Sequence, residues 1–164
     1  MIIDTSILCV WLRVPDMSPC GPQDNQWDYE RVNAKIEEER QRGTLFVLPL
    51  AAIIETGNHI THARGDIYTL VNEFADFIIQ SADGTIPWAT FTAQSSLWNV
   101  DGIKSLAQRW RATGITRQSI GDASIVDVAE YYAEAGNDVE ILTADEGLRS
   151  YQPVSTIRVP RRRK

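Results

Sequence analysis

The chain begins Met1-Ile2-Ile3-Asp4-Thr5-Ser6, so that an aspartate directly follows a short apolar run. β-Branched isoleucines favour a buried strand, whereas Asp, Thr and Ser favour a turn or a helix cap. The stretch therefore predicts a short strand that ends at Asp4. A carboxylate at such a position matters because parallel sheets bind ligands outside the carboxyl ends of their strands.

Similar apolar runs recur along the chain and alternate with segments of helical spacing. Strands are predicted at 1–4, 45–48, 139–143 and 156–159, with an ambiguous one at 86–91 that could instead be a surface loop. Helices are predicted at 25–42, 50–60, 66–81, 102–112, 119–135 and 146–151. Alternating strands and helices need crossover connections, hence a mostly parallel sheet with helices on both faces. The predicted fold class is α/β, with one domain at 1–160 and a basic tail at 161–164.

Composition is that of a globular chain with one sizeable core: 164 residues, 43% hydrophobic and 23% charged. No apolar run approaches the roughly 20 residues that span a bilayer, and the start lacks a basic leader. We therefore expect a cytoplasmic protein without a membrane partner. In that compartment Cys9 and Cys20 are expected to be reduced, and neither is given a role.

The net charge of −6 hides an uneven distribution, because Arg158 and the segment 161–164 supply five of the sixteen basic residues. The rest of the chain has about twice as many acidic as basic side chains and would repel nucleic acid overall. Local basic residues would therefore have to hold any RNA, and the candidates are Arg161, Arg162, Arg163 and Lys164. The alternative is a tail that only improves solubility.

Four acids interrupt or head otherwise apolar segments: Asp4, Glu55, Asp122 and Asp145. Each also has a structural interpretation. Asp4 and Asp145 could be helix N-caps, Asp122 could form a capping box with Ser119, and Glu55 could face solvent.

Helical geometry favours an inward position for Asp122, because it heads an apolar stripe on its own side of the helix. The predicted stripe is Ile125, Val126, Ala129, Tyr132 and Ala133. Asp127 lies well around the helix and is expected at the surface. Asn58 follows Glu55 by one turn and shares its face.

Clustered carboxylates repel one another and raise each other's pKa, so a cation is needed to neutralise them. Oxygen ligands select a hard ion, Mg²⁺ or Mn²⁺. The sequence has no Cys-x-x-Cys pair for zinc, no phosphate-binding glycine loop and no serine nucleophile elbow. His59 and His62 could be offered as zinc ligands, but a contact at a helix end or with phosphate suits them better.

Four segments, Ile2-Ile3-Asp4-Thr5-Ser6, Pro49 to Glu55, Asp122 to Val126 and Leu142 to Asp145, together resemble the PIN-domain nucleases in order and spacing. The resemblance covers almost the whole chain. It implies a three-layer α/β/α sandwich around a mostly parallel sheet of about five strands.

The same resemblance assigns roles to the site residues. The catalytic and metal-binding acids would be Asp4, Glu55, Asp122 and Asp145, and the residues that position them or a water would be Thr5, Ser6, Asn58 and Thr143. Segments 13–25 and 85–100 depart from the family pattern and are candidates for substrate or partner specificity.

The implied activity is metal-dependent hydrolysis of phosphodiester bonds in single-stranded RNA. Many small prokaryotic members of the family are toxins, so the resemblance also allows an antitoxin or other inhibitory protein partner and a homodimer. A haloacid-dehalogenase-like phosphatase would need a second aspartate where the chain has Ser6, and a receiver domain would need a lysine at a later strand end. A PIN-like module that binds RNA or protein without cutting is the remaining alternative.

Overall fold

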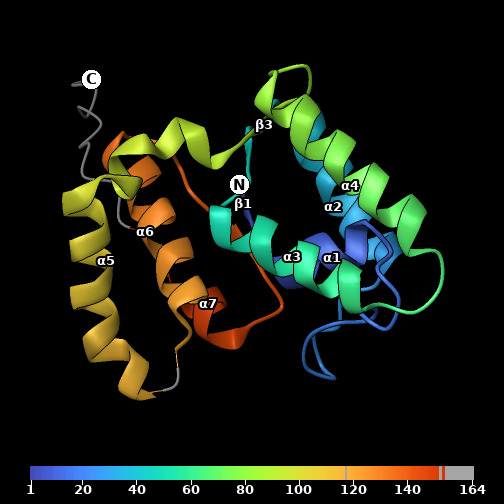
Figure 1. Cartoon of the computed structure of the whole chain (residues 1–164), viewed down its shortest axis with the longest axis horizontal. Coiled ribbons are helices and arrows are strands. Elements are labelled where there is room, and N and C mark those ends of the chain that lie inside the picture. The colour runs from blue at the N-terminus through green and yellow to red at the C-terminus, as the bar shows by residue number, and fades with distance from the viewer. Residues whose placement is uncertain (117, 152, 154–164) are drawn as a thin grey trace, which may run out of the picture.

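The structure of the chain is a computed structural model that describes residues 1–116, 118–151 and 153 (Figure 1). The first half contains β1 (Ile2–Ile3), α1 (Thr5–Trp11), α2 (Tyr29–Gln41), β2 (Phe46–Val47), α3 (Leu50–His62) and α4 (Ile67–Ala82). The second half contains β3 (Trp88–Ala89), the 3₁₀ segments η1 (Phe91–Trp98) and η2 (Gly114–Thr116), α5 (Val100–Thr113), α6 (Ile120–Glu134), β4 (Ile141–Leu142) and α7 (Glu146–Ser150).

The described strands form one all-parallel sheet of four strands in the order β3-β2-β1-β4. Ile2 of β1 pairs with Val47 on one side and with Ile141 on the other. The α/β class and the parallel sheet are thus confirmed. The predicted strand at 156–159 lies outside the described residues.

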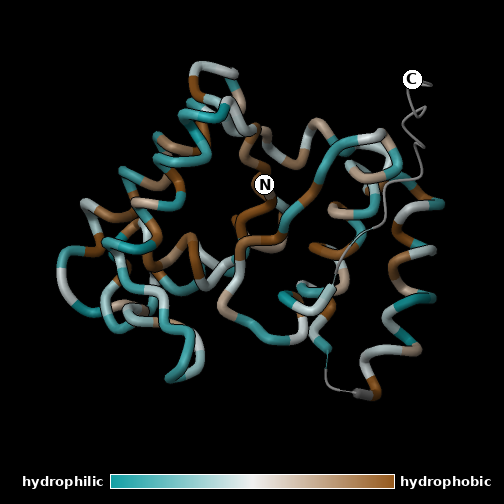
Figure 2. Tube along the Cα trace, turned by 180° about the vertical axis from the view of Figure 1, so that it is seen from behind, coloured by the Kyte–Doolittle hydropathy of each residue, from teal (hydrophilic) through white to brown (hydrophobic). Residues whose placement is uncertain are grey.

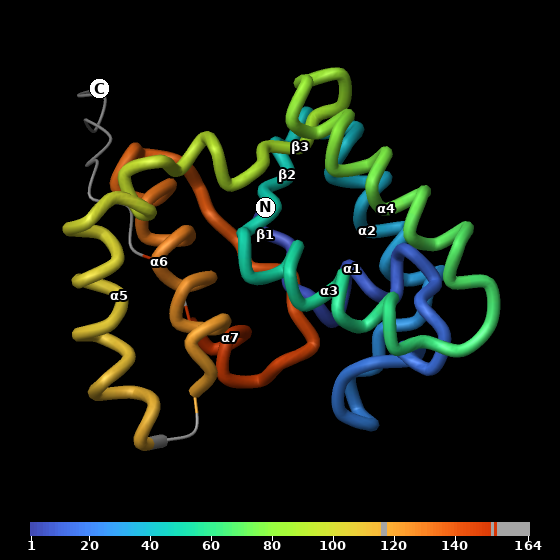
Figure 3. The backbone as a smooth tube through the Cα atoms, in the orientation of Figure 1, coloured from blue at the N-terminus to red at the C-terminus, as the bar shows by residue number. Residues whose placement is uncertain are grey.

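The two faces of the sheet bury different side chains, because neighbouring strand residues point to opposite sides. Ile3 and Phe46 belong to a cluster that includes residues of α1, α2 and α4. Ile2 and Val47 belong to a second cluster with α6 and α7. Figures 1 and 3 show the same division: α5, α6 and α7 lie on one side of the strands, and α1, α2 and α4 lie on the other.

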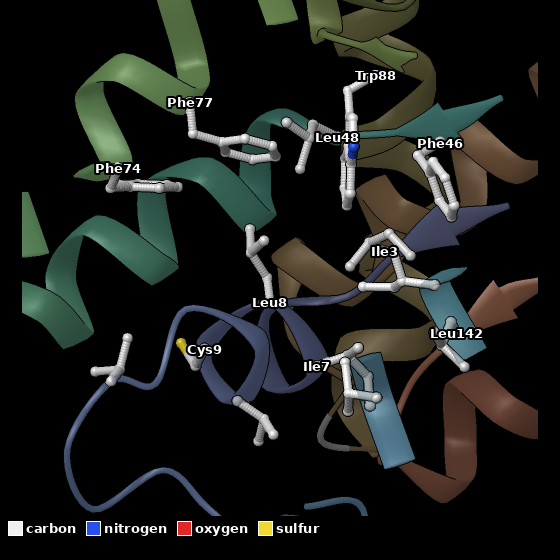
Figure 4. Close-up of a cluster of buried hydrophobic side chains, with 14 of the residues drawn as sticks. Ile3, Ile7, Leu8, Cys9, Phe46, Leu48, Phe74, Phe77, Trp88 and Leu142 are labelled. Carbon is white, nitrogen blue, oxygen red and sulfur yellow. The ribbon is translucent and has the colours of Figure 1, made fainter. Parts of the chain in front are cut away.

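Trp88 resolves the ambiguity of the segment 86–91 in favour of a strand. Its ring is buried and stacks on Phe46 and Trp11, with centroids 4.8 and 5.2 Å apart. Phe77 of α4 meets the same ring edge-on at 4.9 Å. In Figure 4 the Trp88, Phe46 and Phe77 rings gather over Leu8 and Ile3. The hydrophobic segments in Figure 2 likewise concentrate around the central strands.

Most helix boundaries lie within a few residues of those predicted, but α1 was not predicted as a helix. Asp4 caps it, and its residues Ile7 to Val10 are buried. The predicted helix at 25–42 starts later, at Tyr29, because the side chain of Asp28 accepts the backbone N–H of Arg31. Within the described residues, no helix has both the length and the apolar character that crossing a membrane requires.

Candidate functional site

Three of the sequence-predicted acids follow parallel strands. Asp4 comes directly after β1, Asp145 shortly after β4, and Glu55 lies in α3, which follows β2. β1 pairs with both β2 and β4, so these segments leave the same edge of the sheet. Asp122 reaches this region from the first turn of α6, and its charge acts on Asp4.

Asp4 is buried, at 6% exposed, and its carboxylate accepts three hydrogen bonds. The backbone N–H of Thr5 donates to Oδ1 at 2.7 Å. The hydroxyls of Ser6 and Thr143 donate to Oδ2 at 2.7 and 2.8 Å. These bonds fix the carboxylate at the strand end.

Burial raises the pKa of Asp4 above its ordinary 3.8, because it removes water from the charged form. The bonds from Ser6, Thr143 and Thr5 oppose this rise, and the negative charge of Asp122 adds to it. Repulsion between acids was the expected cause of raised pKa values at this site. At Asp4 it contributes, but burial is the larger cause.

Glu55 is half-buried and joins the same group through Thr5, whose hydroxyl donates to Glu55 Oε2 at 2.7 Å. Thr5 therefore binds both acids: its backbone N–H donates to Asp4, and its hydroxyl donates to Glu55 of α3. The other oxygen, Oε1, lies so close to Gly121 of α6 that a Cβ at that glycine would overlap it. α3 and α6 meet at this carboxylate.

Asp122 and Asp145 adopt the capping roles that the sequence allowed. Asp122 and Ser119 form a capping box, with Ser119 N donating to Asp122 Oδ2 at 3.1 Å. Asp145 Oδ1 accepts the backbone N–H of Leu148 at 2.9 Å. Asp122 is half-buried at the start of α6, and the next two residues, Ala123 and Ser124, are buried.

The chemistry of the donor set fits a hard divalent cation. The ligand atoms would be carboxylate oxygens. The caps at Asp122 and Asp145 each use one carboxylate oxygen, whereas both oxygens of Asp4 already accept hydrogen bonds. The spacing, however, is not that of a formed metal centre. Within residues 1–116, 118–151 and 153, no three acidic, cysteine or histidine side chains converge closely enough to hold an ion.

Thr143 and Ser6 connect the ends of β1 and β4. While donating to Asp4, the Thr143 hydroxyl accepts Asp145 N at 2.9 Å, and the Ser6 hydroxyl accepts Ala144 N at 3.2 Å. The structure thus brings together Thr5, Ser6 and Thr143 with the predicted acids. It does not link the Asn58 side chain to them by any hydrogen bond between described residues; Asn58 is exposed.

Both histidines are exposed near the end of α3. His62 Nδ1 lies 2.7 Å from the carbonyl oxygen of Asn58, which is the expected contact at a helix end. The two cysteines are free, and burial raises the pKa of Cys9 to about 11. Arg161, Arg162, Arg163 and Lys164 lie outside the described residues.

Asp127 is not the surface acid that the helical offset suggested. It is 6% exposed and pairs with Arg109 of α5, which also binds Glu130 at 2.7 Å. Burial raises the pKa of Asp127, and the Arg109 charge opposes the rise. The side of α6 away from the sheet is covered by α5, so the position is interior although it faces away from the sheet.

The segment 13–25, which departs from the family pattern, packs beside the site. Cys20 pairs with Trp27 in an antiparallel bridge, and Cys20 Sγ lies 3.7 Å from the carbonyl oxygen of Ser6. Gly21 has φ +92°, and a Cβ there would meet Ala144, next to Asp145. A loop with no recognised motif therefore forms one wall near the acids.

An apolar groove on the opposite side of Glu55 was missed by sequence reasoning. The only signal available was Gly121, since a glycine inside a predicted helix often marks a close approach.

No protein-family model, curated protein or solved structure matches the chain. The chemistry of the site is therefore the basis for a functional assignment.

Proposed function

We propose that the chain is a PIN-like, metal-dependent endoribonuclease that cuts single-stranded RNA. The observation that carries the proposal is the linkage of Asp4 and Glu55 through Thr5, at the edge of the sheet where Asp145 also leaves a parallel strand. In α/β sheets this edge is where ligands bind. The proposal includes the three-layer sandwich of that family.

Each residue has a defined task in this proposal. Asp4, Glu55, Asp122 and Asp145 would hold Mg²⁺ or Mn²⁺ through carboxylate oxygens. When bound, such an ion supplies an activated water and neutralises charge on the scissile phosphate. Ser6 and Thr143 orient Asp4, and Thr5 orients Glu55, because each donates a hydrogen bond to one defined oxygen.

The resemblance extends the proposal to a biological role. A small nuclease of this kind would act in the cytoplasm as the toxin of a toxin-antitoxin pair, and a protein that covers the acidic site would inhibit it. A homodimer is part of the same proposal. Arg161, Arg162, Arg163 and Lys164 would hold the RNA backbone by charge.

The test compares Asp4→Asn and Asp122→Asn with the wild type on single-stranded RNA in Mn²⁺. Both variants should lose cleavage by on the order of a hundredfold or more, because each removes a ligand charge from the metal centre. Asp83→Asn is the matched control, since Asp83 is exposed at the end of α4. Undiminished cleavage by both variants would remove the nuclease assignment from these residues.

A second candidate function is a PIN-like module that binds RNA without cutting it. It is favoured by the lack, among the described residues, of three side chains that converge on one point. Mn²⁺ titration calorimetry and an RNA cleavage assay, each with and without chelator, separate the two candidates. RNA binding without metal uptake or cleavage would support the binding module.

A further inference from the structure

A groove of about 260 Å³ lies between α3, η1, α5 and α6, at the opposite side of Glu55 from Thr5. Its lining is mostly apolar: Leu50, Ala51, Ile54, Trp98, Leu106 and Ile120. Gly121, Ser124 and Glu55 complete it. Ser124 turns its hydroxyl to the carbonyl oxygen of Gly121, at 2.7 Å, so it adds little free polarity to the groove.

The groove is continuous with the acidic site through one side chain. Glu55 binds Thr5 with Oε2, while its Oε1 lies at Gly121, a residue of the groove wall. A strand that runs from the acids past Glu55 therefore meets Ile54 and Ile120 of the groove. Both isoleucines are about half exposed and present apolar surface.

The dimensions and chemistry of the groove restrict what it can bind. It is slightly smaller than the pockets of about 300–1,000 Å³ that hold drug-sized ligands, which suits one ring system. Glu55 at its end disfavours a phosphate or another anion inside it. Aliphatic walls with one tryptophan suit a flat, neutral and aromatic group, which in a nucleic acid is the base.

We propose that this groove binds the nucleobase next to the phosphate held at the acids, so that Ile54, Trp98 and Ile120 form a base subsite. The inference rests on the proposed function, because the RNA backbone is what brings a base to this position. The subsite side chains are apolar apart from the indole of Trp98, whose buried Nε1 has no hydrogen-bond partner among the described residues. We therefore expect the subsite to distinguish a strand with bases from a strand without them.

The experiment pairs the protein variant Ile54→Ser with a change in the nucleic acid. Fluorescence anisotropy measures binding of a labelled uridine decamer and of a decamer with abasic sites. Both are measured in Ca²⁺ instead of Mn²⁺, since this hard cation binds carboxylate oxygens and would hold the phosphate at the acids while hydrolysis stays slow. The wild type should bind the base-containing strand on the order of tenfold more tightly. Ile54→Ser should lose most of this preference, because it replaces an apolar wall by a hydroxyl.

Ile79→Ser is the matched control. Ile79 is 56% exposed on α4, against 54% for Ile54, and α4 lies on the other side of the sheet (Figure 1). It should keep the wild-type preference. The inference fails if Ile54→Ser still prefers the base-containing decamer, or if the wild type shows no such preference. It also fails if the molar mass of Ile54→Ser drops from dimer to monomer, since the groove would then face a second copy.

Cleavage by the wild type in Mn²⁺ is measured separately. If the protein shows the Ile54-dependent preference but no metal-dependent cleavage, the base subsite is supported and the nuclease proposal fails. If the protein cleaves RNA but binds both decamers equally, the nuclease proposal is supported and the base subsite fails.

Discussion

At Asp4, burial and hydrogen bonding act on the carboxylate in opposite directions. Burial is the larger effect, so the pKa in the folded state lies above the ordinary 3.8. The native protein then binds the proton more tightly than the unfolded chain does. The resulting stabilisation is fully present below about pH 4 and is lost as the pH rises through the raised pKa.

Asp4→Asn removes this titration and keeps the size of the side chain. In chelator, the free energy of unfolding of the wild type should therefore fall relative to that of the variant as the pH rises above about 4 and through the raised pKa. Urea unfolding at several pH values measures it. A difference between the two proteins that stays constant with pH, or grows in favour of the wild type, contradicts the raised pKa.

Mn²⁺ should act in the reverse direction at pH 7. An ion that binds only the folded wild type adds about 2.7 kcal/mol at a hundredfold excess over its Kd. Asp4→Asn should gain clearly less, because it has lost one charged ligand. Equal gains in the two proteins would place the bound ion elsewhere.

Between elements, Gly121 controls how closely α6 approaches α3. A Cβ at this position would overlap Glu55 Oε1, the mobile end of a side chain, so Gly121→Ala should fold but displace the Glu55 carboxylate from Thr5. Cleavage and Mn²⁺ affinity should both decrease, by on the order of tenfold or more. Calorimetry and the RNA cleavage assay measure the two quantities.

Gly57→Ala is the control, since Gly57 lies in α3, the same helix as Glu55. A Cβ there meets only Phe74, at 3.9 Å, which is ordinary contact distance. The substitution should stabilise α3 by about 0.5–1 kcal/mol and leave cleavage unchanged. If both alanine variants lose cleavage equally, helix flexibility rather than the position of Glu55 is responsible.

Helices and strands were predictable where the signal lies in neighbouring residues, and not where it depends on contacts with residues far along the chain. Residues 1–4 and 139–143 were recognisable as strands because their signal is local, and Asp4 and Asp145 followed as strand-end acids. Asp127 was misplaced because it lies roughly 140° around the helix from Asp122, and the packing of α5, from which Arg109 reaches it, makes that side interior. α1 was missed because a short apolar run fits a strand or a helix equally well.

The same limit applies to the site. The sequence supplied Asp4, Thr5, Ser6 and Thr143, which the structure joins by hydrogen bonds. The groove beside Glu55 could not be predicted, because it forms where α3, which ends at His62, packs against η1, α5 and α6, which begin only at Phe91. No local pattern carries information about such a juxtaposition.

At the scale of the whole molecule, the net negative charge is unfavourable for binding RNA, the proposed substrate. The acidic residues outnumber the basic ones by 22 to 16, and four of the basic residues lie in the last four positions. RNA that approaches the acids therefore meets repulsion from the rest of the chain. Attraction has to come from a concentrated source, and residues 161–164 are the densest positive charge in the sequence.

Replacing Arg161, Arg162, Arg163 and Lys164 together by glutamine tests this role without shortening the chain. If all four contact phosphates of a single strand, the slope of log affinity against log salt should flatten by up to about 2.8, since each contact contributes about 0.7. Binding at low salt should weaken accordingly, and fluorescence anisotropy over a salt series measures both.

The double variant Lys104→Gln with Arg111→Gln controls for net charge, because both positions are exposed on α5. A flattening that is the same per charge removed in the two variants would show that the tail acts only through net charge, whereas an unchanged slope in the tail variant would make the tail a solubilising segment.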